Sequence, residues 1–415
     1  MANTGAITVY LDSQDYSRMS DVRTRTPELD QVRDVLQRHA TTGKVKFVFS
    51  AAIISEMTPL DAQHASIASR KADLLFDLCG PHTLISLERL FDAEVAHLLK
   101  LDRPPVNAIS DDATWFPNIP PDLISTRWLD TKKVLAETLK ERGSSRAERR
   151  ETMRKSFKGN VPTKAFRASL TQQDGQKFMN AFLQSYPMRP EDANVWVQYA
   201  LGNASEVQLN DALLSSFRYP RWMMKWFSNQ HDLAGPMIEW VRGPSNQIGK
   251  VMRDMVAHAK LWSELRAVHD LPSKPEMLTA KGWGVQCEKQ ILTVTSRWIE
   301  DRFPGHSKAI SYESVELNCL GTVSMIRSFY SALWDSVGGG RSALPSDSQA
   351  VDVMHAAYAP YVNVFRADRY MAPHISKQVK RFGTRVVNRL EDVPAVLSEL
   401  ILQRGGQGEP LPSIQ

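Results

Sequence analysis

The stretch VDVMHAAYAPYVNVFRADR, residues 351–369, decides how we interpret the fold. It predicts a helix, a tight turn and a short buried strand. Asp352 stands near the start of that helix, and Asp368 stands just past the end of the strand. Such positions hold reactive groups in α/β proteins, because the sheet fixes them and the loop leaves them open to water. They also suit a carboxylate that complements a helix dipole or stabilises a turn, so this stretch alone leaves both interpretations open.

The N-terminal part of the chain adds two carboxylates in comparable positions. Residues 7–12, ITVYLD, are typical of a buried strand that delivers Asp12 to its C-terminal edge. Residues 45–50, VKFVFS, predict a second strand, and residues 51–57, AAIISEM, open a helix that bears Glu56. Both ends of the chain therefore place acids where strands end or helices begin.

In this order the acids resemble those of PIN-domain nucleases. That family has an Asp after its first strand, a Glu in the helix after the second, an Asp that opens a late helix and an Asp after the next strand. The matching positions are Asp12, Glu56, Asp352 and Asp368. Residues 383–397 also resemble the last strand and last helix of the family. The resemblance covers about residues 1–100 and 340–404.

Two features depart from the family pattern. Arg366 and Ala367 stand where the family often has Thr or Ser shortly before its last Asp, and the two halves are separated by more sequence than a compact PIN domain needs. The resemblance implies an α/β fold, a PIN-like three-layer α/β/α arrangement around a central, mostly parallel sheet, interrupted by a large α-helical insertion.

The composition changes inside the chain, which gives the expected domain boundaries. All ten Trp lie between Trp115 and Trp334, in a mostly amphipathic helical region. We expect residues 1–101 to form the first half of the PIN-like domain and 345–404 the second half. Residues 102–344 are expected to form the helical insertion with its own core, and 405–415 a disordered tail.

Charge, cysteines and hydropathy indicate the broad class. The net charge of +5 is mildly basic and does not by itself demand a nucleic-acid partner. Cys79, Cys287 and Cys319 are far apart and odd in number, so they predict neither a metal site nor a disulfide framework. We see no signal peptide and no apolar run long enough to span a membrane. A soluble, cytoplasmic protein without membrane association is expected.

One basic segment, here called the basic arm, lies within the expected insertion. Its members are Arg146, Arg149, Arg150, Arg154, Lys155 and Lys158. They are expected to contact the phosphates of a nucleic acid, and the family resemblance implies RNA in preference to DNA. The alternative is a solvated helix face with ion pairs to neighbouring glutamates. The local excess of positive charge favours the first interpretation.

The four acids matched to the family imply a metal site. Like charges in one pocket repel, and stability gives no reason to assemble them. Mg²⁺ or Mn²⁺ would offset that repulsion, because both prefer oxygen ligands and keep bound water. We therefore expect Asp12, Glu56, Asp352 and Asp368 to be the catalytic and metal-binding residues. His355, which shares a helix face with Asp352, is expected to orient that acid, touch the substrate or simply pack.

The resemblance implies a Mg²⁺- or Mn²⁺-dependent endonuclease, a hydrolase that leaves a 3′-hydroxyl and a 5′-phosphate, with RNA as the favoured substrate. Family habit suggests a toxin or antiviral-defence effector, and a protein partner or inhibitor is compatible with such a role. The alternative is a catalytically silent PIN-like scaffold whose helical insertion binds protein or nucleic acid. Four intact acids favour the enzyme, since a scaffold has no need of them all.

Overall fold

The computed structural model describes residues 5–23, 25–59, 64–101, 106–116, 131–159, 161–169, 188–200, 203–229, 235–269, 279–306, 309–337 and 347–405. The chain forms two compact units. The sheet unit comprises Met1–Glu56, Asp77–Pro117 and Trp240–Gln415. The helical unit comprises Met57–Phe76 and Asn118–Glu239.

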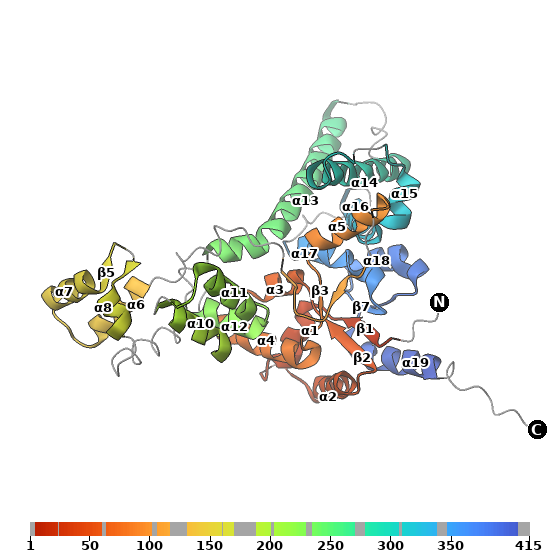
Figure 1. Cartoon of the computed structure of the whole chain (residues 1–415). Helices are drawn as coiled ribbons and strands as arrows, with labels where there is room; N and C mark the ends of the chain where they lie inside the picture. The colour runs from red at the N-terminus through yellow and green to blue at the C-terminus, as the bar shows by residue number, and fades with distance from the viewer. Residues whose placement is uncertain are drawn as a thin grey trace, which may run out of the picture. The chain divides into compact units, whose positions relative to one another are not determined.

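A four-stranded parallel sheet organises the sheet unit (Figure 1). Its strand order is β2 (Val45–Val48), β1 (Ile7–Tyr10), β7 (Val364–Arg366) and β8 (Arg385–Val387). The apolar side chains of β1, β2 and β7 are buried, as in parallel strands that are covered on both faces. The predicted α/β fold with a parallel sheet is therefore confirmed, and it is compatible with three layers.

The strand order indicates at which edge of the sheet a ligand would bind. From β1 the chain moves to β2 on one side, whereas β7 pairs with β1 on the other side. Ligands of open parallel sheets bind outside the carboxyl ends of the strands at such a reversal. β1 ends at Tyr10 and β7 ends at Arg366, so Asp12 and Asp368 each follow two residues beyond a strand at this edge.

Helices connect these strands and cover the sheet. Contacts join α19 to β1 and β7, α2 to β2, and α18 to β8. The bounds are α1 (Ser13–Ser20), α2 (Pro27–Thr41), α3 (Ala51–Met57), α5 (Leu87–Leu98), α17 (Asp347–Ala356), α18 (Met371–Val379) and α19 (Val393–Gly405). Most of α4 (Ala65–Cys79) belongs to the helical unit. A short antiparallel pair, β3 (Thr83–Leu84) and β4 (Ile109–Ser110), adds to the sheet unit.

Three further helices, and α13 from Trp240 onward, belong to the sheet unit. Their bounds are α13 (Gly235–His269), α14 (Ala280–Arg302), α15 (Tyr312–Asn318) and α16 (Leu320–Val337). Ile291 of α14, Val315 of α15 and Val323 of α16 pack with Val95 of α5 in one apolar core. α16 also contacts α17 and α18 (Figure 1), so these helices support the elements that carry Asp352 and follow Asp368.

A buried carboxylate fixes the start of α16. Glu94 of α5 accepts hydrogen bonds from the Gly321 amide at 2.5 Å, the Thr322 amide at 3.1 Å and the Thr322 hydroxyl at 2.7 Å. These amides lie in the first turn of a helix, where they lack partners within the helix. A Cβ on Gly321 would lie 2.6 Å from the carbonyl oxygen of Ala357. Glycine thus lets α16 approach the end of α17 closely.

The compact units divide the chain differently from the expected domains. Residues 102–344 were expected to form one helical insertion with its own core. Instead, residues 240–337 belong to the same unit as the sheet, because α14, α15 and α16 share their apolar core with α5. Amphipathic periodicity shows that a helix has an apolar face but does not name the partner of that face.

The helical unit contains the rest of the expected insertion. Its elements include α6 (Thr131–Glu141), α7 (Arg146–Ser156), β5 (Phe157–Lys158), β6 (Val161–Pro162), α8 (Lys164–Ser169), α10 (Pro190–Ala200), α11 (Glu206–Phe217) and α12 (Pro220–Asn229). α10 and α11 pack through Met188, Ala193 and Ala212.

Two sequence expectations concern membranes and the C-terminus. Among the described helices, none combines the length and hydropathy that a bilayer crossing requires. α19 reaches Gly405, where the disordered tail was expected to begin. Residues 406–415 of that expected tail lie outside the described part of the chain.

Candidate active site

Asp12 and Asp368 are held by the same local device. Each follows a buried strand and accepts a hydrogen bond from the first turn of the next helix. The Asp12 carboxylate accepts from the amide of Gln14 at 2.8 Å, and that of Asp368 accepts from the amide of Met371 at 2.5 Å. Helix starts stabilise negative charge, because their free amides point toward it. The sheet thus fixes two of the predicted acids at one edge.

Asp352 and Glu56 come from helices. Asp352 lies past the first turn of α17, which begins at Asp347, and its side chain is half-buried. Glu56 lies near the end of α3, and its side chain is 19% exposed. Neither acid caps its helix, so local helix stability does not explain their positions.

Asp12 and Asp352 line one cavity, and charge repulsion couples Asp352 to the other predicted acids. Burial raises the pKa of Asp352 well above its usual value, and repulsion from Asp12, Asp368 and Glu56 raises it further. Burial also raises the pKa of Asp12, and Glu56 adds to that shift. We call Asp12, Glu56, Asp352 and Asp368 the acid cluster. Like charges couple in this way only over short distances.

A chain of polar groups orients Glu56. The Nε2 atom of His355 lies 3.1 Å from the Glu56 carboxylate, and Nδ1 is hydrogen-bonded to the Tyr10 hydroxyl. The Tyr10 hydroxyl is in turn 2.6 Å from the Ser50 hydroxyl. Burial opposes ionisation of Glu56, but the contacts with His355, together with Ser13 and Arg242, lower its pKa below the usual value. His355 therefore positions Glu56, whereas we had expected it to orient Asp352, touch the substrate or simply pack.

Arg366 introduces a positive charge that sequence reasoning did not assign to the site. Its side chain is 5% exposed, and Nη2 lies 3.1 Å from the carboxylate of Asp15, which is wholly buried. Burial raises the pKa of Asp15 to about 7, although Arg366 opposes this. Arg366 also opposes the pKa increases of Asp12 and Asp352. The sequence does contain one signal of this role, because Arg366 is a charged residue in an otherwise apolar, buried strand.

Asp15 also helps to cap the start of α1. It completes a capping box with Asp12, because its carboxylate accepts the Asp12 amide at 3.1 Å. This contact ties the acid after β1 to the start of α1. Asp15 therefore links the position of Asp12 to the Arg366 guanidinium.

The acid cluster borders a small cavity. Its volume is about 10 Å³, and Asp12, Asp352, His355 and Arg366 are among its lining residues. Carboxylate oxygens are the donors that Mg²⁺ and Mn²⁺ prefer, so the chemistry of the site fits a hard dication. Within the described residues, however, no three His, Cys, Asp or Glu side chains stand ready to hold a metal ion. Binding of an ion would require these carboxylates to rotate toward it.

The basic arm lies in the helical unit, on α7 and β5. Arg149 is half-buried, and the other predicted members, Arg146, Arg150, Arg154, Lys155 and Lys158, are exposed. Lys155 forms an ion pair with Glu151 at 2.6 Å, as the solvated-face interpretation expected for some members. Ser145 and Glu148 form a capping box at the start of α7. The arm is thus a well-capped helix that presents several guanidinium groups to solvent.

Compared with family models, curated proteins and solved structures, the chain matches none of them.

Proposed function

We propose that this protein is a Mg²⁺- or Mn²⁺-dependent nuclease of the PIN-like kind, and that it cleaves RNA in preference to DNA. The proposal rests on one observation. Asp12 and Asp352 line one small cavity at the carboxyl edge of a parallel sheet, where repulsion from Asp12, Asp368 and Glu56 adds to the raised pKa of Asp352. The folded state would be more stable if these charges lay apart, and a bound cation would relieve their repulsion.

The charge balance of the site supports a cation. The four acids and Asp15 supply five carboxylates, and Arg366 is the guanidinium that opposes the raised pKa values of Asp12 and Asp352. Arg366 is already paired with Asp15. Arg242 lies close enough to Glu56 to lower its pKa, so the excess of negative charge falls on Asp12, Asp352 and Asp368.

Each residue of the site would have a distinct role. Asp12 and Asp352 border the cavity and would hold the ion, with Glu56 and Asp368 joining directly or through water. A bound Mg²⁺ or Mn²⁺ supplies Lewis acidity that activates water and stabilises charge on a leaving oxygen. His355 keeps Glu56 oriented and ionised, and Arg366 keeps Asp15 in place behind Asp12.

The basic arm supports a polyanionic substrate. Exposed arginines on one capped helix are suited to phosphate contacts, which supply most sequence-independent affinity for nucleic acids. A function as a toxin or antiviral-defence effector, with a protein inhibitor that controls it, is consistent with this activity and forms part of the proposal. No membrane is involved in the proposed activity.

The test is cleavage of labelled single-stranded RNA, structured RNA and DNA, with EDTA, Mg²⁺ or Mn²⁺. Asp12→Asn and Asp352→Asn should each reduce the rate by about 100-fold or more, because each removes a ligand charge. Asp34→Asn provides the matched control, since Asp34 is an exposed carboxylate of α2. Circular dichroism should show that all three variants are folded. Cleavage that survives in both site variants would contradict the proposal.

A second candidate is a catalytically silent PIN-like scaffold that binds protein or nucleic acid. The Arg366–Asp15 and His355–Glu56 contacts favour it, because they occupy acids of the site with protein partners. A scaffold predicts no cleavage of any substrate with either metal, together with RNA binding that the acid-to-amide variants leave unchanged.

A further inference from the structure

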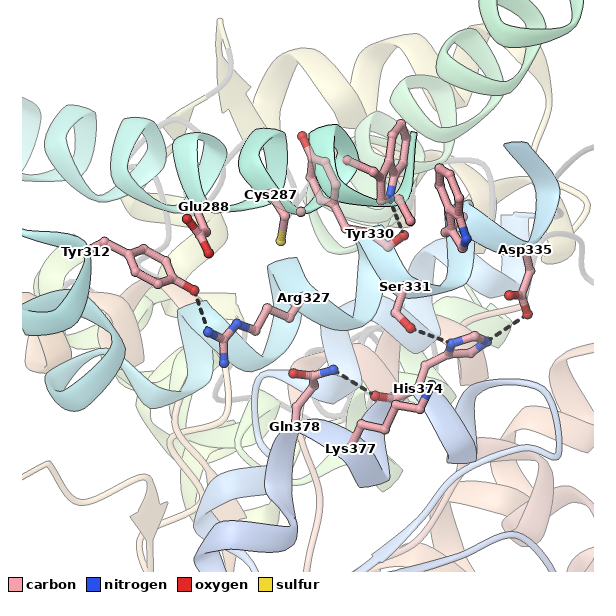
Figure 2. A pocket seen from close by; sticks show the side chains of 14 residues that line it. Cys287, Glu288, Tyr312, Arg327, Tyr330, Ser331, Asp335, His374, Lys377 and Gln378 are labelled. Atoms are coloured by element: carbon pink, nitrogen blue, oxygen red, sulfur yellow. Dashed lines mark hydrogen bonds and ion pairs between the residues drawn. The ribbon is translucent and has the colours of Figure 1, made fainter. Parts of the chain in front are cut away.

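A second pocket lies in the sheet unit, away from the acid cluster. It has a volume of about 370 Å³ and is formed by α14, α15, α16 and α18 (Figure 2). Pockets for small ligands begin at about 300 Å³, so this one suits a ligand of the size of one nucleotide. Its lining combines aromatic rings with cationic and acidic side chains.

The aromatic wall comes from α14 and α16. The ring of Trp283 lies 5.2 Å from that of Tyr330 and 5.8 Å from that of Trp334, measured between centroids. The Trp283 indole donates a hydrogen bond to the Tyr330 carbonyl at 2.8 Å, which fixes its orientation. Trp283 and Trp334 are both half-buried, so each indole keeps part of its surface open. Exposed indole faces of this kind stack on planar rings such as nucleobases.

Two cations line the same pocket. Lys377 of α18 is exposed, and within the described residues it has no acidic partner at ion-pair distance. Arg327 of α16 donates to the Tyr312 hydroxyl (Figure 2). It also pairs with Glu316 at 2.9 Å. A guanidinium has five N–H groups, so these two contacts leave further donors. Glu288 and Asp335 also line the pocket, so an anionic group such as a phosphate would bind at Lys377 and at the remaining donors of Arg327.

Polar groups complete the lining. His374 of α18 contacts the Ser331 hydroxyl at 2.9 Å and the Asp335 carboxylate at 3.4 Å, both on α16 (Figure 2). Glu288 of α14 is exposed at the same pocket. Carboxylates and hydroxyls accept hydrogen bonds from the N–H groups of a base or from ribose hydroxyls. Stacking, phosphate-binding and hydrogen-bonding groups are therefore present within one pocket.

α18 lies between this pocket and the acid cluster. Met371 and Ile375 of α18 line the small cavity beside Asp12 and Asp352, whereas His374 and Lys377 line the larger pocket. These two sets of residues occupy different faces of the helix. A ligand held by Lys377 would thus contact the helix whose first turn binds the Asp368 carboxylate.

We propose that this pocket binds one nucleotide, with its base on Trp283 and Trp334 and its phosphate on Lys377 and Arg327. The same chemistry is offered by a free nucleotide and by one nucleotide of a single strand that reaches the acid cluster. Only the second source rests on the proposed nuclease function. Binding can be measured without cleavage, so failure of one proposal is distinguishable from failure of the other.

The experiment is a calorimetric titration of the full chain in EDTA. One series uses AMP, GMP, CMP and UMP, and another uses short single-stranded RNA of mixed sequence. Lys377→Glu and Trp334→Ala should each weaken binding by about ten-fold or more, because each removes a phosphate or stacking contact. Lys380→Glu is the matched control, an exposed lysine near the end of α18 that does not line the pocket, and its affinity should stay within about two-fold of wild type.

The two probes distinguish the source of the ligand. Saturable binding of a monophosphate that Lys377→Glu weakens identifies a free nucleotide. Binding of the RNA alone, weakened by Lys377→Glu and unaffected by Lys380→Glu, identifies a nucleotide of a strand. If neither Lys377→Glu nor Trp334→Ala weakens the binding of either probe, the proposal is wrong. Trp334→Phe serves as the second stacking variant should Trp334→Ala fail to fold.

Discussion

The acid cluster and the basic arm carry opposite charges, and they differ in their exposure to solvent. Asp12 is 9% exposed and its neighbour Asp15 is wholly buried, whereas Arg150 and Arg154 lie open to solvent on α7. Charges in water cost the fold little, and buried charges cost several kcal/mol unless they are compensated. The cost of burying the acid cluster therefore indicates that its charges serve a function. The exposed charges of the basic arm cost too little for the same conclusion.

The strongest way to break this comparison is to remove the buried guanidinium. Arg366→Met should lower the free energy of unfolding by about 3–5 kcal/mol, because it leaves buried carboxylates without a cation. Arg385→Met is the control in the adjacent strand, where the arginine pairs with Glu399 at 2.7 Å and both side chains are half exposed. It should cost only about 0–1 kcal/mol. Equal effects in urea unfolding would contradict the assigned cost of burial.

The pH dependence of stability sharpens the comparison further. The pKa of Asp15 is raised from its usual value of 3.8 to about 7 in the folded protein. The folded state therefore holds a proton that the unfolded chain releases. This stabilisation is fully present below about pH 4 and is lost as the pH rises through 7.

In EDTA, unfolding experiments between pH 5 and 8 should thus show falling stability, by a few kcal/mol at most. Asp15→Asn should make this dependence shallower, because an amide does not titrate, whereas Asp12 and Asp352 with their raised pKa values retain part of it. A wild-type protein whose stability rises over this window would contradict the direction of the shift.

Removing one charge from the acid cluster should stabilise the metal-free protein. Asp352→Asn relieves repulsion with Asp12, Glu56 and Asp368, so it should raise the free energy of unfolding by on the order of 1 kcal/mol in EDTA. The control Asp34→Asn should stay within about 0.5 kcal/mol of wild type. Added Mn²⁺ should stabilise the wild type more than the Asp352→Asn variant. The opposite order of stabilisation would argue against a cation at this site.

The smallest effect on folding is expected in the basic arm. Replacing Arg146, Arg150 and Arg154 by Glu should change stability by no more than about 0.5 kcal/mol per residue, since all three side chains are exposed. The affinity for RNA should fall, and its dependence on salt should become weaker. Filter binding at several salt concentrations measures both. Unchanged affinity would identify the arm as a solvated helix face.

Local patterns were sufficient to predict the strand-borne acids. Apolar runs before Asp12 and Asp368 indicated buried strands, and parallel strands place their carboxyl ends at one edge. Tertiary pairing was not predictable in the same way. Arg366 was visible as a departure from the family pattern, but its partner Asp15 depends on the pairing of β1 with β7.

The helical part of the chain shows the same limit. Helices were expected between residues 102 and 344, but α16 was not expected to pack on α17 and α18. That contact depends on a buried carboxylate, Glu94, and on a glycine, Gly321, that are far apart in the sequence. The link from Tyr10 through His355 to Glu56 likewise joins three separate segments. Periodicity along one segment contains no information about such partners.

The central claim is that the acid cluster holds a divalent cation. The most direct measurement is a crystal structure soaked in Mn²⁺, with anomalous difference density collected near the manganese edge. The account predicts a peak about 2.2 Å from carboxylate oxygens of Asp12 and Asp352, with Glu56 and Asp368 in its first or second shell. An ordered site without a peak at saturating Mn²⁺, with Arg366 still facing these acids, would contradict it.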